Sequence, residues 1–424
     1  MPSTLRPTRP RIRGMPTTTK LRAEGHLIDD GTLHRMFDAI VSTGATYEVA
    51  EFLIGRTKEQ TSSILIEVTA PDEGKLAEIG QELTRLGCEA VDASEVRLIP
   101  APRDGVAPDH FYSSTNHATE IRHGGEWVPV SHQRMDALIV VDGGQARCVK
   151  LRSVREGEHV VVGSNGVRVS PPERDLDAED FGFMNSEVSS ERHVELVVGG
   201  LAKQIREIQA AGKKVIVVAG PVVVHTGGVA AMERLIRSRI IDGILAGNAL
   251  AVHDIESTLL NTSLGIDVDT GHGVAGGHTH HMRAINEIRK AGSIPAAVEQ
   301  GVLTRGIMYE CVRNSVPYVL AGSLRDDGPL PEAITDMNEA QEAYALMLEG
   351  AGLVLILSTM LHGIATGNML PSYVTTVCVD INPAVVTKLC DRGSSQTVGV
   401  VTDVGLFLHM LADKLGEGQE KAES

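Results

Sequence analysis

The sequence predicts an α/β protein with a mainly parallel sheet in its carboxy-terminal half, preceded by an α+β module and a small β-rich unit. Two observations carry this prediction. From Lys213 onward, apolar runs of strand length alternate with helical patterns, as in a doubly wound, Rossmann-like domain. Before that, the order helix, strand, strand, helix, strand is typical of a ferredoxin-like module. We expect four parts: a disordered tail (1–20), the ferredoxin-like module (21–130), the β-rich unit with a linker (131–180) and the Rossmann-like domain (181–416).

Composition excludes several classes of protein. The 424 residues are 42% hydrophobic and 22% charged, which suits a soluble protein of two or three domains. The net charge of -16 at pH 7 makes nucleic acid or an anionic membrane an unfavourable partner. The longest apolar run, Leu353 to Leu361, is far shorter than the roughly twenty residues that span a bilayer. We therefore expect a cytoplasmic protein that binds neither nucleic acid nor membrane.

The cysteines and the amino terminus agree with that location. The five cysteines are an odd number and widely spaced, which disfavours a disulfide framework or a zinc site and indicates reduced thiols. They are Cys88, Cys148, Cys311, Cys378 and Cys390. The first residues are basic and proline-rich but contain no apolar segment, so they do not form a signal peptide.

The ferredoxin-like module begins with a helix. Leu33, Met36 and Ile40 recur at helical spacing within residues 24–43, after a short strand at Leu27 and Ile28. The next elements are predicted as strands at Tyr47 to Ile54 and Ser62 to Thr69, a helix from Asp72 to Leu86, and a strand from Val91 to Ile99.

A polar and aromatic stretch, Asp109 to Val130, has the composition of a binding loop and hairpin. Arg122 could hold a carboxylate in a bidentate pair, and Asn116 or Thr119 could orient an amine, so the stretch could bind a zwitterion. A well hydrogen-bonded hairpin anchored by Trp127 explains the same residues equally well. Both interpretations stay open on this chemistry.

Short strands and tight turns follow from Ala137 to Val169, and a proline-rich acidic linker from Ser170 to Asp180. A helix is then predicted from Glu191 to Ala211, with Ser189 and Ser190 as candidate caps.

Two glycine-rich turns follow neighbouring buried strands of the Rossmann-like domain. Val215 to Ala219 precedes Gly220 and the Thr226-Gly227-Gly228 turn, and Ile240 to Ala246 precedes Gly247-Asn248-Ala249. Helix amino termini and bare backbone N–H groups meet at this edge of an open sheet, where they bind phosphate. Alone, the turns fit any doubly wound domain equally well.

Four further strands end in small or polar residues. They are Pro317 to Leu320, Leu353 to Leu357, Thr375 to Val379 and Gln396 to Val401, with helices predicted at His281 to Ala291, at Leu303 to Arg313 and at the carboxy terminus. Asp380, at a strand tip, could accept the hydroxyls of an adenosine ribose, or it could form an Asx turn that leads into Pro383. The repetition of strand, polar tip and helix favours nucleotide binding.

A glycine- and histidine-rich loop contains His272, His278, His280 and His281. No carboxylate or cysteine stands at a recurrent ligand spacing, so a surface loop or lid is favoured over a metal site. We therefore expect no metal.

Five long segments of the sequence are informative together: FYSSTNHATEIRHGGEWVPV, VVAGPVVVHTGG, LAGNALAVHDIE, VPYVLAGSLRDDGPLPE and STMLHGIATGNMLP. They resemble the archaeal and cyanobacterial type of ornithine cyclodeaminase, whose first region is the conserved region of lysine-oxoglutarate reductase/saccharopine dehydrogenase. The resemblance covers the chain from about Glu24 to Leu415. The carboxy-terminal half has a weaker likeness to deoxyhypusine-synthase-like NAD-binding folds.

The resemblance implies NAD as cofactor and L-ornithine as substrate, which is converted to L-proline and ammonia without net oxidation. It implies no action on arginine, because no arginine-dihydrolase domain resembles any part of this sequence. With the resemblance, the candidate acid/base residues are His225, Asp254 and Asp326, and those for the substrate are Asn116, Thr119 and Arg122. The cofactor candidates are Gly220, Thr226, Gly227, Gly228, Gly247, Asn248, Ala249, Ser323, Thr359, Asp380 and Asp403.

Two other functions stay open at this point. One is an NAD-dependent amino-acid dehydrogenase of the lysine or saccharopine type, and the other is a non-catalytic sensor of an amino acid and a nucleotide. Apolar helix faces and the exposed edge of the first module favour a homo-oligomer, a dimer or a tetramer.

Overall fold

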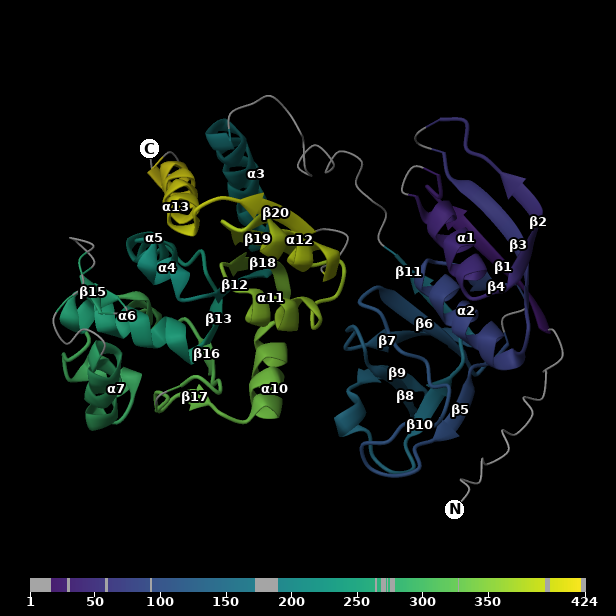
Figure 1. The fold of residues 1–424 in the computed structure, drawn as a ribbon, viewed down its shortest axis with the longest axis horizontal. Coiled ribbons are helices and arrows are strands. Elements are labelled where there is room, and N and C mark those ends of the chain that lie inside the picture. The colour runs from purple at the N-terminus through teal and green to yellow at the C-terminus, as the bar shows by residue number, and fades with distance from the viewer. Residues whose placement is uncertain are drawn as a thin grey trace, which may run out of the picture. The chain divides into compact units, whose positions relative to one another are not determined.

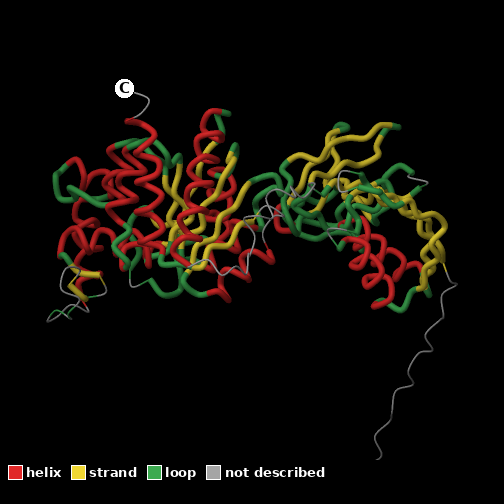
Figure 2. Tube along the Cα trace, turned by 90° about the horizontal axis from the view of Figure 1, so that it is seen from above, coloured by secondary structure: helices red, strands yellow, loops and turns green. Residues whose placement is uncertain are grey.

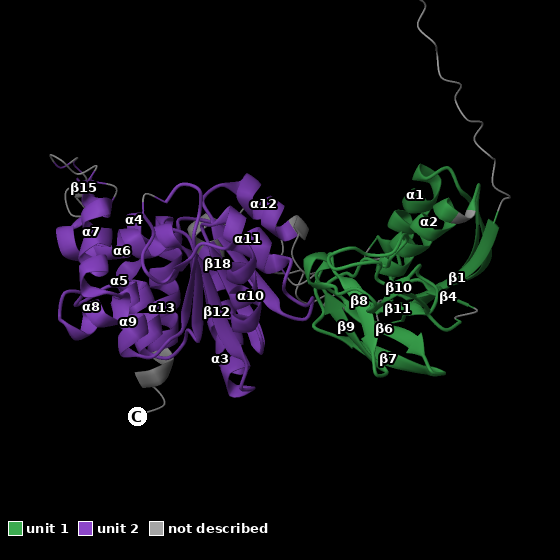
Figure 3. Ribbon diagram, turned by 90° about the horizontal axis from the view of Figure 1, so that it is seen from below, with its two compact units in different colours: residues 1–174 green, residues 175–424 purple. Residues whose placement is uncertain are grey.

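The computed structural model describes residues 17–28, 31–57, 60–91, 94–171, 190–263, 265–267, 272, 274, 279–326, 328–392 and 397–420. The chain divides into two compact units, Met1–Arg174 and Asp175–Ser424, which Figure 3 shows in different colours. Most of the predicted linker, the candidate cap Ser189 and His278 lie outside the described residues.

The first sheet of unit 1 has the predicted ferredoxin-like order. Its elements are β1 (Thr17–Gly25), α1 (Thr32–Ser42), β2 (Thr46–Leu53), β3 (Ser62–Ala70), α2 (Glu73–Arg85) and β4 (Glu89–Ala90). The strand order is β2-β3-β1-β4, and each neighbouring pair is antiparallel. Met36 and Ile40 of α1 and Ile79 of α2 pack with Ile64 and Ile66 of β3, so both helices share one core with the sheet.

Three predictions about this module are wrong. Residues 17–20, expected in the tail, form part of β1, which pairs with both β3 and β4. Leu27 and Ile28 lie in a turn instead of a strand. The strand predicted from Val91 to Ile99 is divided, since β4 ends at Ala90 and β5 (Arg97–Pro100) joins another sheet. For residues 17–20 and for the divided strand, long-range pairing outweighs the local pattern.

A second, seven-stranded sheet completes unit 1. It contains β5, β6 (Ala118–His123), β7 (Glu126–Ser131), β8 (Leu138–Asp142), β9 (Gln145–Val149), β10 (His159–Val162) and β11 (Val167–Ser170), with a 3-10 turn at Leu151–Ser153. The order is β11-β6-β7-β9-β8-β10-β5. The β6–β7 hairpin pairs with β11 on one side and β9 on the other, so the sheet crosses the boundary expected at residue 130.

Unit 2 is built on a fully parallel sheet. Its strands are β12 (Lys214–Ala219), β13 (Gly243–Gly247), β16 (Tyr318–Ala321), β17 (Ala333–Ile334), β18 (Ala351–Leu357), β19 (Thr375–Asp380) and β20 (Thr397–Val401). The order β17-β16-β13-β12-β18-β19-β20 is that of a doubly wound sheet, with its direction of winding reversed between β12 and β18. The Rossmann-like prediction is confirmed, and β17 is the one strand of this sheet that the pattern did not predict.

Helices cover both faces of this sheet (Figures 1 and 2). They are α3 (Ser190–Ala210), α4 (Val222–His225), α5 (Val229–Arg237), α6 (Asn248–Leu260), α7 (His280–Ala291), α8 (Ile294–Glu299), α9 (Ile307–Arg313), α10 (Met337–Met347), α11 (Met360–Gly367), α12 (Pro383–Arg392) and α13 (Val404–Glu420). The larger core joins α3, α5 and α13 to one face, and the smaller core joins α10 and α12 to the other. A two-stranded ribbon, β14 (Thr262–Ser263) and β15 (Ile266–Asp267), follows α6.

Three other observations concern membranes, cysteines and metals. Within the described residues, no helix is both long and apolar enough to cross a membrane. None of the five cysteines, which all lie among the described residues, forms a disulfide bond, and all except Cys390 are buried. The described part of the chain contains no group of three His, Cys, Asp or Glu side chains that could hold a metal ion.

Candidate functional site

The carboxyl ends of β12 and β18 meet at the point where the winding of the sheet reverses. The Gly220 N–H donates to the Leu357 carbonyl oxygen at 2.9 Å. A Cβ on Gly220 would overlap the carbonyl group of Ser358, a residue with a φ of 47°. The strand ends are therefore held so close that only a hydrogen fits at position 220. In open α/β sheets, ligands bind in the crevice at this point.

Two helices begin at this edge without a side-chain cap. The N-cap of α6 is Gly247 and that of α11 is Thr359, and neither accepts a hydrogen bond from the first turn through a side chain. By contrast, Ser293 caps α8 and Asp336 caps α10 through their side chains. The first-turn N–H groups of α6 and α11 are thus left for a ligand, and an anion such as a dinucleotide phosphate suits them. These residues fit NAD.

The glycine turn after α4 is fixed from several sides. Gly227 has a φ of 76°, and its carbonyl oxygen lies 3.1 Å from His409 Nε2 of α13. A Cβ on Gly228 would lie 2.9 Å from the Val223 carbonyl oxygen. The Thr226 hydroxyl donates to the Val222 carbonyl at 2.9 Å. Thr226 therefore helps to close the turn.

Asp380 and Asp403 each use one carboxylate oxygen within their own loops. Oδ1 of Asp380 accepts the Asn382 N–H at 2.8 Å, which is an Asx turn, and Oδ1 of Asp403 accepts the Leu406 N–H at 2.8 Å, which caps α13. The Asx turn considered for Asp380 is thus present. In both residues Oδ2 is left to accept a ribose hydroxyl.

Two other candidates have structural partners. Oδ1 of the buried Asn248 accepts the Leu330 N–H at 3.0 Å. The fully buried Asp254 accepts the Ile307 and Met308 N–H groups at 2.9 and 2.8 Å, and so caps α9. Burial raises the pKa of Asp254 to about 7, against the opposing effect of these two hydrogen bonds. Both oxygens are occupied, which argues against Asp254 as a catalytic acid or base.

His225 is exposed itself, but it joins a polar network of buried side chains. Its Nδ1 lies 2.5 Å from Ser263 Oγ, and its ring centroid lies 5.0 Å from that of His253. The His253 ring in turn contacts Glu256, with 3.1 Å between Nδ1 and Oε2. Burial and the neighbouring His253 lower the pKa of His225, while Glu256 acts in the opposite direction. A neutral imidazole at the end of α4 is therefore favoured.

Asp326 lies in a tight turn after β16. Its Oδ2 accepts the Ser323 N–H at 2.7 Å, and the Ser323 hydroxyl lies 3.3 Å from Oδ1. The field of Asp326 acts on His362, a residue in the first turn of α11 that the sequence did not single out. His362 Nδ1 lies 3.1 Å from the hydroxyl of Tyr344 on α10. A histidine shortly after a buried strand, in STMLHG, is the signal that could have identified it.

The substrate candidates in unit 1 do not converge. Asn116 and Thr119 are buried, and the Thr119 hydroxyl donates to the His117 carbonyl at 2.9 Å. Thr119 faces the buried side of β6, whereas Arg122, three residues on, faces the other side and lies 5.9 Å from the Trp127 ring. A single zwitterion therefore cannot contact both Thr119 and Arg122 within this sheet. The Trp127-anchored hairpin accounts for Arg122.

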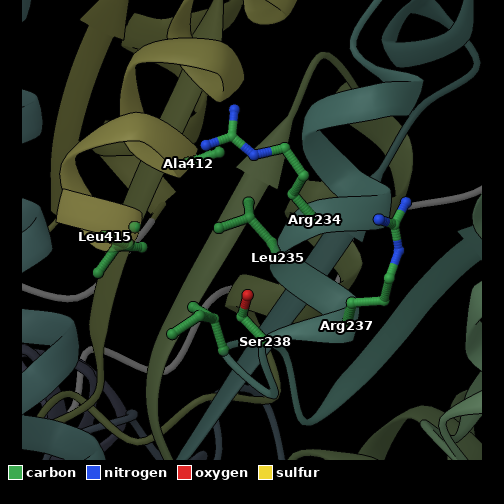
Figure 4. Close-up of a pocket in the computed structure, with 8 residues that line it drawn as sticks. Arg234, Leu235, Arg237, Ser238, Ala412 and Leu415 are labelled. Atoms are coloured by element: carbon green, nitrogen blue, oxygen red, sulfur yellow. The ribbon is translucent and has the colours of Figure 1, made fainter. Parts of the chain in front are cut away.

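A small pocket of unit 2 lies between the last turn of α5 and α13 (Figure 4). Its rim includes Arg234 and Arg237. Arg234 pairs with Asp413 at 2.7 Å, and Arg237 pairs with Glu233 and Glu310 at 3.0 and 2.9 Å. Both guanidinium groups are thus already neutralised, so the pocket offers no charge for a ligand.

Comparison with known proteins identifies the family. Residues 199–411 match the Rossmann-fold region of the arginine dihydrolase ArgZ-like carboxy-terminal part, and residues 118–198 match the first region of that part. Residues 18–117 match the LOR/SDH bifunctional enzyme conserved region. An ornithine cyclodeaminase of Methanocaldococcus jannaschii is 51% identical over 404 residues, which cover 93% of this chain and 96% of the relative. The chain belongs to the ornithine cyclodeaminase family.

Solved structures agree with this membership. The crystal structure of apo ArgZ, a cyanobacterial arginine dihydrolase, matches 97% of this chain with 43% identity and a TM-score of 0.85. The AgrE protein of Nostoc, a bifunctional arginine dihydrolase/ornithine cyclodeaminase, is 50% identical, and its structure in a ternary complex with ornithine and NAD+ gives a TM-score of 0.53. This chain spans 61% of the ArgZ chain and 59% of the AgrE chain.

Proposed function

We propose that this protein converts L-ornithine to L-proline and ammonia with bound NAD. The observation that carries the proposal is the 51% identity to an ornithine cyclodeaminase over nearly the full length of both chains. The carboxyl edge of the sheet supports it, because the uncapped helices α6 and α11, which begin there after β13 and β18, suit a dinucleotide. AgrE, which is 50% identical, has been crystallised with ornithine and NAD+.

The reaction is redox-neutral. When bound, NAD supplies a hydride acceptor for Cα of ornithine that later returns the hydride to the cyclic imine. The chain itself holds the reactants together, so that the δ-amine attacks within the same molecule and gains a large effective molarity. The α-nitrogen then leaves as ammonia.

The cofactor candidates lie in segments that end or follow strands of the sheet in unit 2. We assign the phosphates to the backbone at the uncapped helix starts, Gly247, Asn248, Ala249 and Thr359, with Thr226 and Ser323 beside them. Gly220, Gly227 and Gly228 are proposed to line the site as positions without a side chain, because their own N–H groups donate to carbonyl oxygens of the chain. Asp380 and Asp403 are the candidate acceptors for ribose hydroxyls. Asn116, Thr119 and Arg122 stay candidates for substrate binding as separate contacts, and His225 and Asp326 for proton transfer.

The proposal is tested by incubating the purified protein with L-ornithine and NAD+ while proline, ammonia and NADH absorbance are followed together. We expect equal amounts of proline and ammonia and no accumulation of NADH. Ammonia with stoichiometric NADH and no proline would contradict the proposal.

One observation favours a second function. Residues 18–117 match the conserved region of a lysine-oxoglutarate reductase/saccharopine dehydrogenase. A dehydrogenase acting on a lysine-like amino acid would produce NADH with lysine or saccharopine in the same assay. Proline release from ornithine without NADH would exclude it.

We also propose a cytoplasmic homo-oligomer, a dimer or a tetramer. In unit 1, β2 is an edge strand whose side chains are exposed almost throughout, including Tyr47, Val49 and Leu53. Exposed edges of this kind are usually covered in the assembled protein. Light scattering on the purified chain gives the mass, and a monomer would contradict the proposal.

A further inference from the structure

His362 has a defined tautomer. The Tyr344 hydroxyl donates its one hydrogen to the Ala246 carbonyl oxygen at 2.8 Å. Burial raises the pKa of Tyr344, so this hydrogen stays in place. In the 3.1 Å contact with His362, the donor must therefore be Nδ1–H of the imidazole. Neutral His362 thus carries its proton on Nδ1 and a free lone pair on Nε2.

The free nitrogen lies at the carboxyl edge of the sheet. A Cβ on Gly247 would lie 2.8 Å from His362 Nε2, so Nε2 lies directly over the carboxyl end of β13. His362 itself belongs to α11, which follows β18. In the sheet, β12 lies between β13 and β18. The His362 side chain therefore extends from α11, across the carboxyl end of β12, to the end of β13. His225, by contrast, is directed at Ser263 and His253.

The surroundings allow His362 to gain and lose a proton. Among the described residues, the titratable groups that act on it are Asp326, from the turn after β16, and the neutral Tyr344, from α10. Burial lowers the pKa of His362, and the Asp326 carboxylate acts in the opposite direction. The imidazole is neutral at pH 7, and a nearby negative charge stabilises the imidazolium when it forms.

We propose that His362 Nε2 accepts the proton of the α-ammonium group of the substrate. This inference rests on the proposed function and deepens it. The N–H bond breaks, its electron pair stays on the α-nitrogen, and Nε2 gains the proton before the hydride leaves Cα. The same Nε2–H returns the proton to the α-nitrogen as ammonia departs, so His362 ends as it began. Tyr344 is a positioning residue, because it fixes the tautomer and orientation of the ring.

The test compares three variants with the wild-type protein: His362→Gln, Tyr344→Phe and, as a matched control, Tyr318→Phe on β16. For each, kcat and kcat/KM for ornithine are measured from pH 5 to 9, together with NAD+ affinity and the far-UV circular dichroism spectrum. His362→Gln should lower kcat by about 10²–10⁴-fold, as expected for a lost general base. It should also abolish the acid limb of kcat/KM while NAD+ affinity stays within about threefold.

Tyr344→Phe separates a positioning role from a structural one. The imidazolium loses the acceptor of its Nδ1–H, so the pKa of His362 should fall and the acid limb should move to lower pH. We expect kcat to fall by about tenfold, a smaller loss than that of His362→Gln. Tyr318→Phe should change neither the limb nor kcat.

Three outcomes overturn the inference. If His362→Gln keeps kcat within about threefold, or keeps the wild-type acid limb, His362 is not the proton acceptor. If His362→Gln does not fold, an unmoved acid limb in Tyr344→Phe overturns it instead. Wild-type protein that makes no proline from ornithine removes the proposed function, and this inference falls with it. If the wild-type protein converts ornithine and His362→Gln is equally active, only this inference is overturned and the proposed function stands.

Discussion

At the scale of single residues, the glycines were predictable and the histidine was not. Gly220, Gly227 and Gly228 stand out because glycine-rich turns follow apolar runs. In the structure a Cβ would overlap neighbouring atoms at Gly220 and Gly228, and Gly227 has a positive φ. His362 and Tyr344 lie on two different helices, and their contact arises only when those helices pack on one sheet face. No local pattern in the sequence encodes such a contact.

The Gly220→Ala variant tests whether the close approach of β12 and β18 requires glycine at position 220. The new Cβ would overlap the Ser358 carbonyl and push β12 and β18 apart, so stability should fall by about 1–3 kcal/mol. NAD+ affinity, measured by titration calorimetry, should fall about tenfold or more. The matched control is Gly199→Ala in α3, where a Cβ meets no atom within 4 Å. It should raise stability by about 0.5–1 kcal/mol, and an equal loss of affinity in both variants would refute the explanation.

At the scale of elements, the sheet of unit 2 was predictable because its strands are buried on both faces and read as unbroken apolar runs. β1 was not predicted because its sequence is mostly polar. It is a strand because it pairs with β3. The helix expected from Leu303 begins at Ile307 instead, because Gly306 has a φ of 102° and Asp254 caps the next two N–H groups. A cap supplied from a helix fifty residues earlier has no local sequence signal.

Asp254→Ala tests the assignment of this residue as a cap. Two buried N–H groups of α9 lose their acceptor, so the free energy of unfolding should fall by about 2–4 kcal/mol. The control is Asp336→Ala, which removes the more exposed cap of α10 and should cost about 0.5–2 kcal/mol. Denaturant unfolding gives both values. A loss of kcat above about tenfold in folded Asp254→Ala would restore Asp254 as a catalytic candidate.

The same variant should change the pH dependence of stability. Burial raises the pKa of Asp254 to about 7 from its usual 3.8, so the folded chain binds this proton more tightly than the unfolded chain. Between those values the contribution of Asp254 to stability falls as pH rises. Urea midpoints measured from pH 4 to 7 should therefore fall less steeply with pH in Asp254→Ala than in the wild-type protein. An unchanged slope would show that Asp254 ionises normally.

At the scale of the whole molecule, the two units separate the two kinds of candidate residue. The cofactor candidates lie in unit 2, which has its own core and complete sheet, and the substrate candidates Asn116, Thr119 and Arg122 lie in unit 1. The sequence predicted a boundary between these two groups of residues because the stretch from Ser170 to Asp180 has the proline-rich, acidic composition of a linker. It did not predict that the seven-stranded sheet of unit 1 has strands on both sides of residue 130, because the partners of a strand depend on long-range hydrogen bonds.

Residues 190–420 produced alone should therefore bind NAD+ with the affinity of the full chain, measured by titration calorimetry. They should release no ammonia from ornithine. Turnover by this fragment would show that the substrate residues proposed in unit 1 are dispensable.

The fate of the hydrogen on Cα tests the redox-neutral reaction most directly. L-Ornithine deuterated at Cα is converted by the protein in ordinary water with NAD+, and the proline is analysed by mass spectrometry and NMR. A hydride that leaves and returns on the same bound cofactor predicts proline that keeps the deuterium at C2, with none in free NADH. Proline without deuterium, or deuterium accumulating in free NADH, would contradict the proposed reaction.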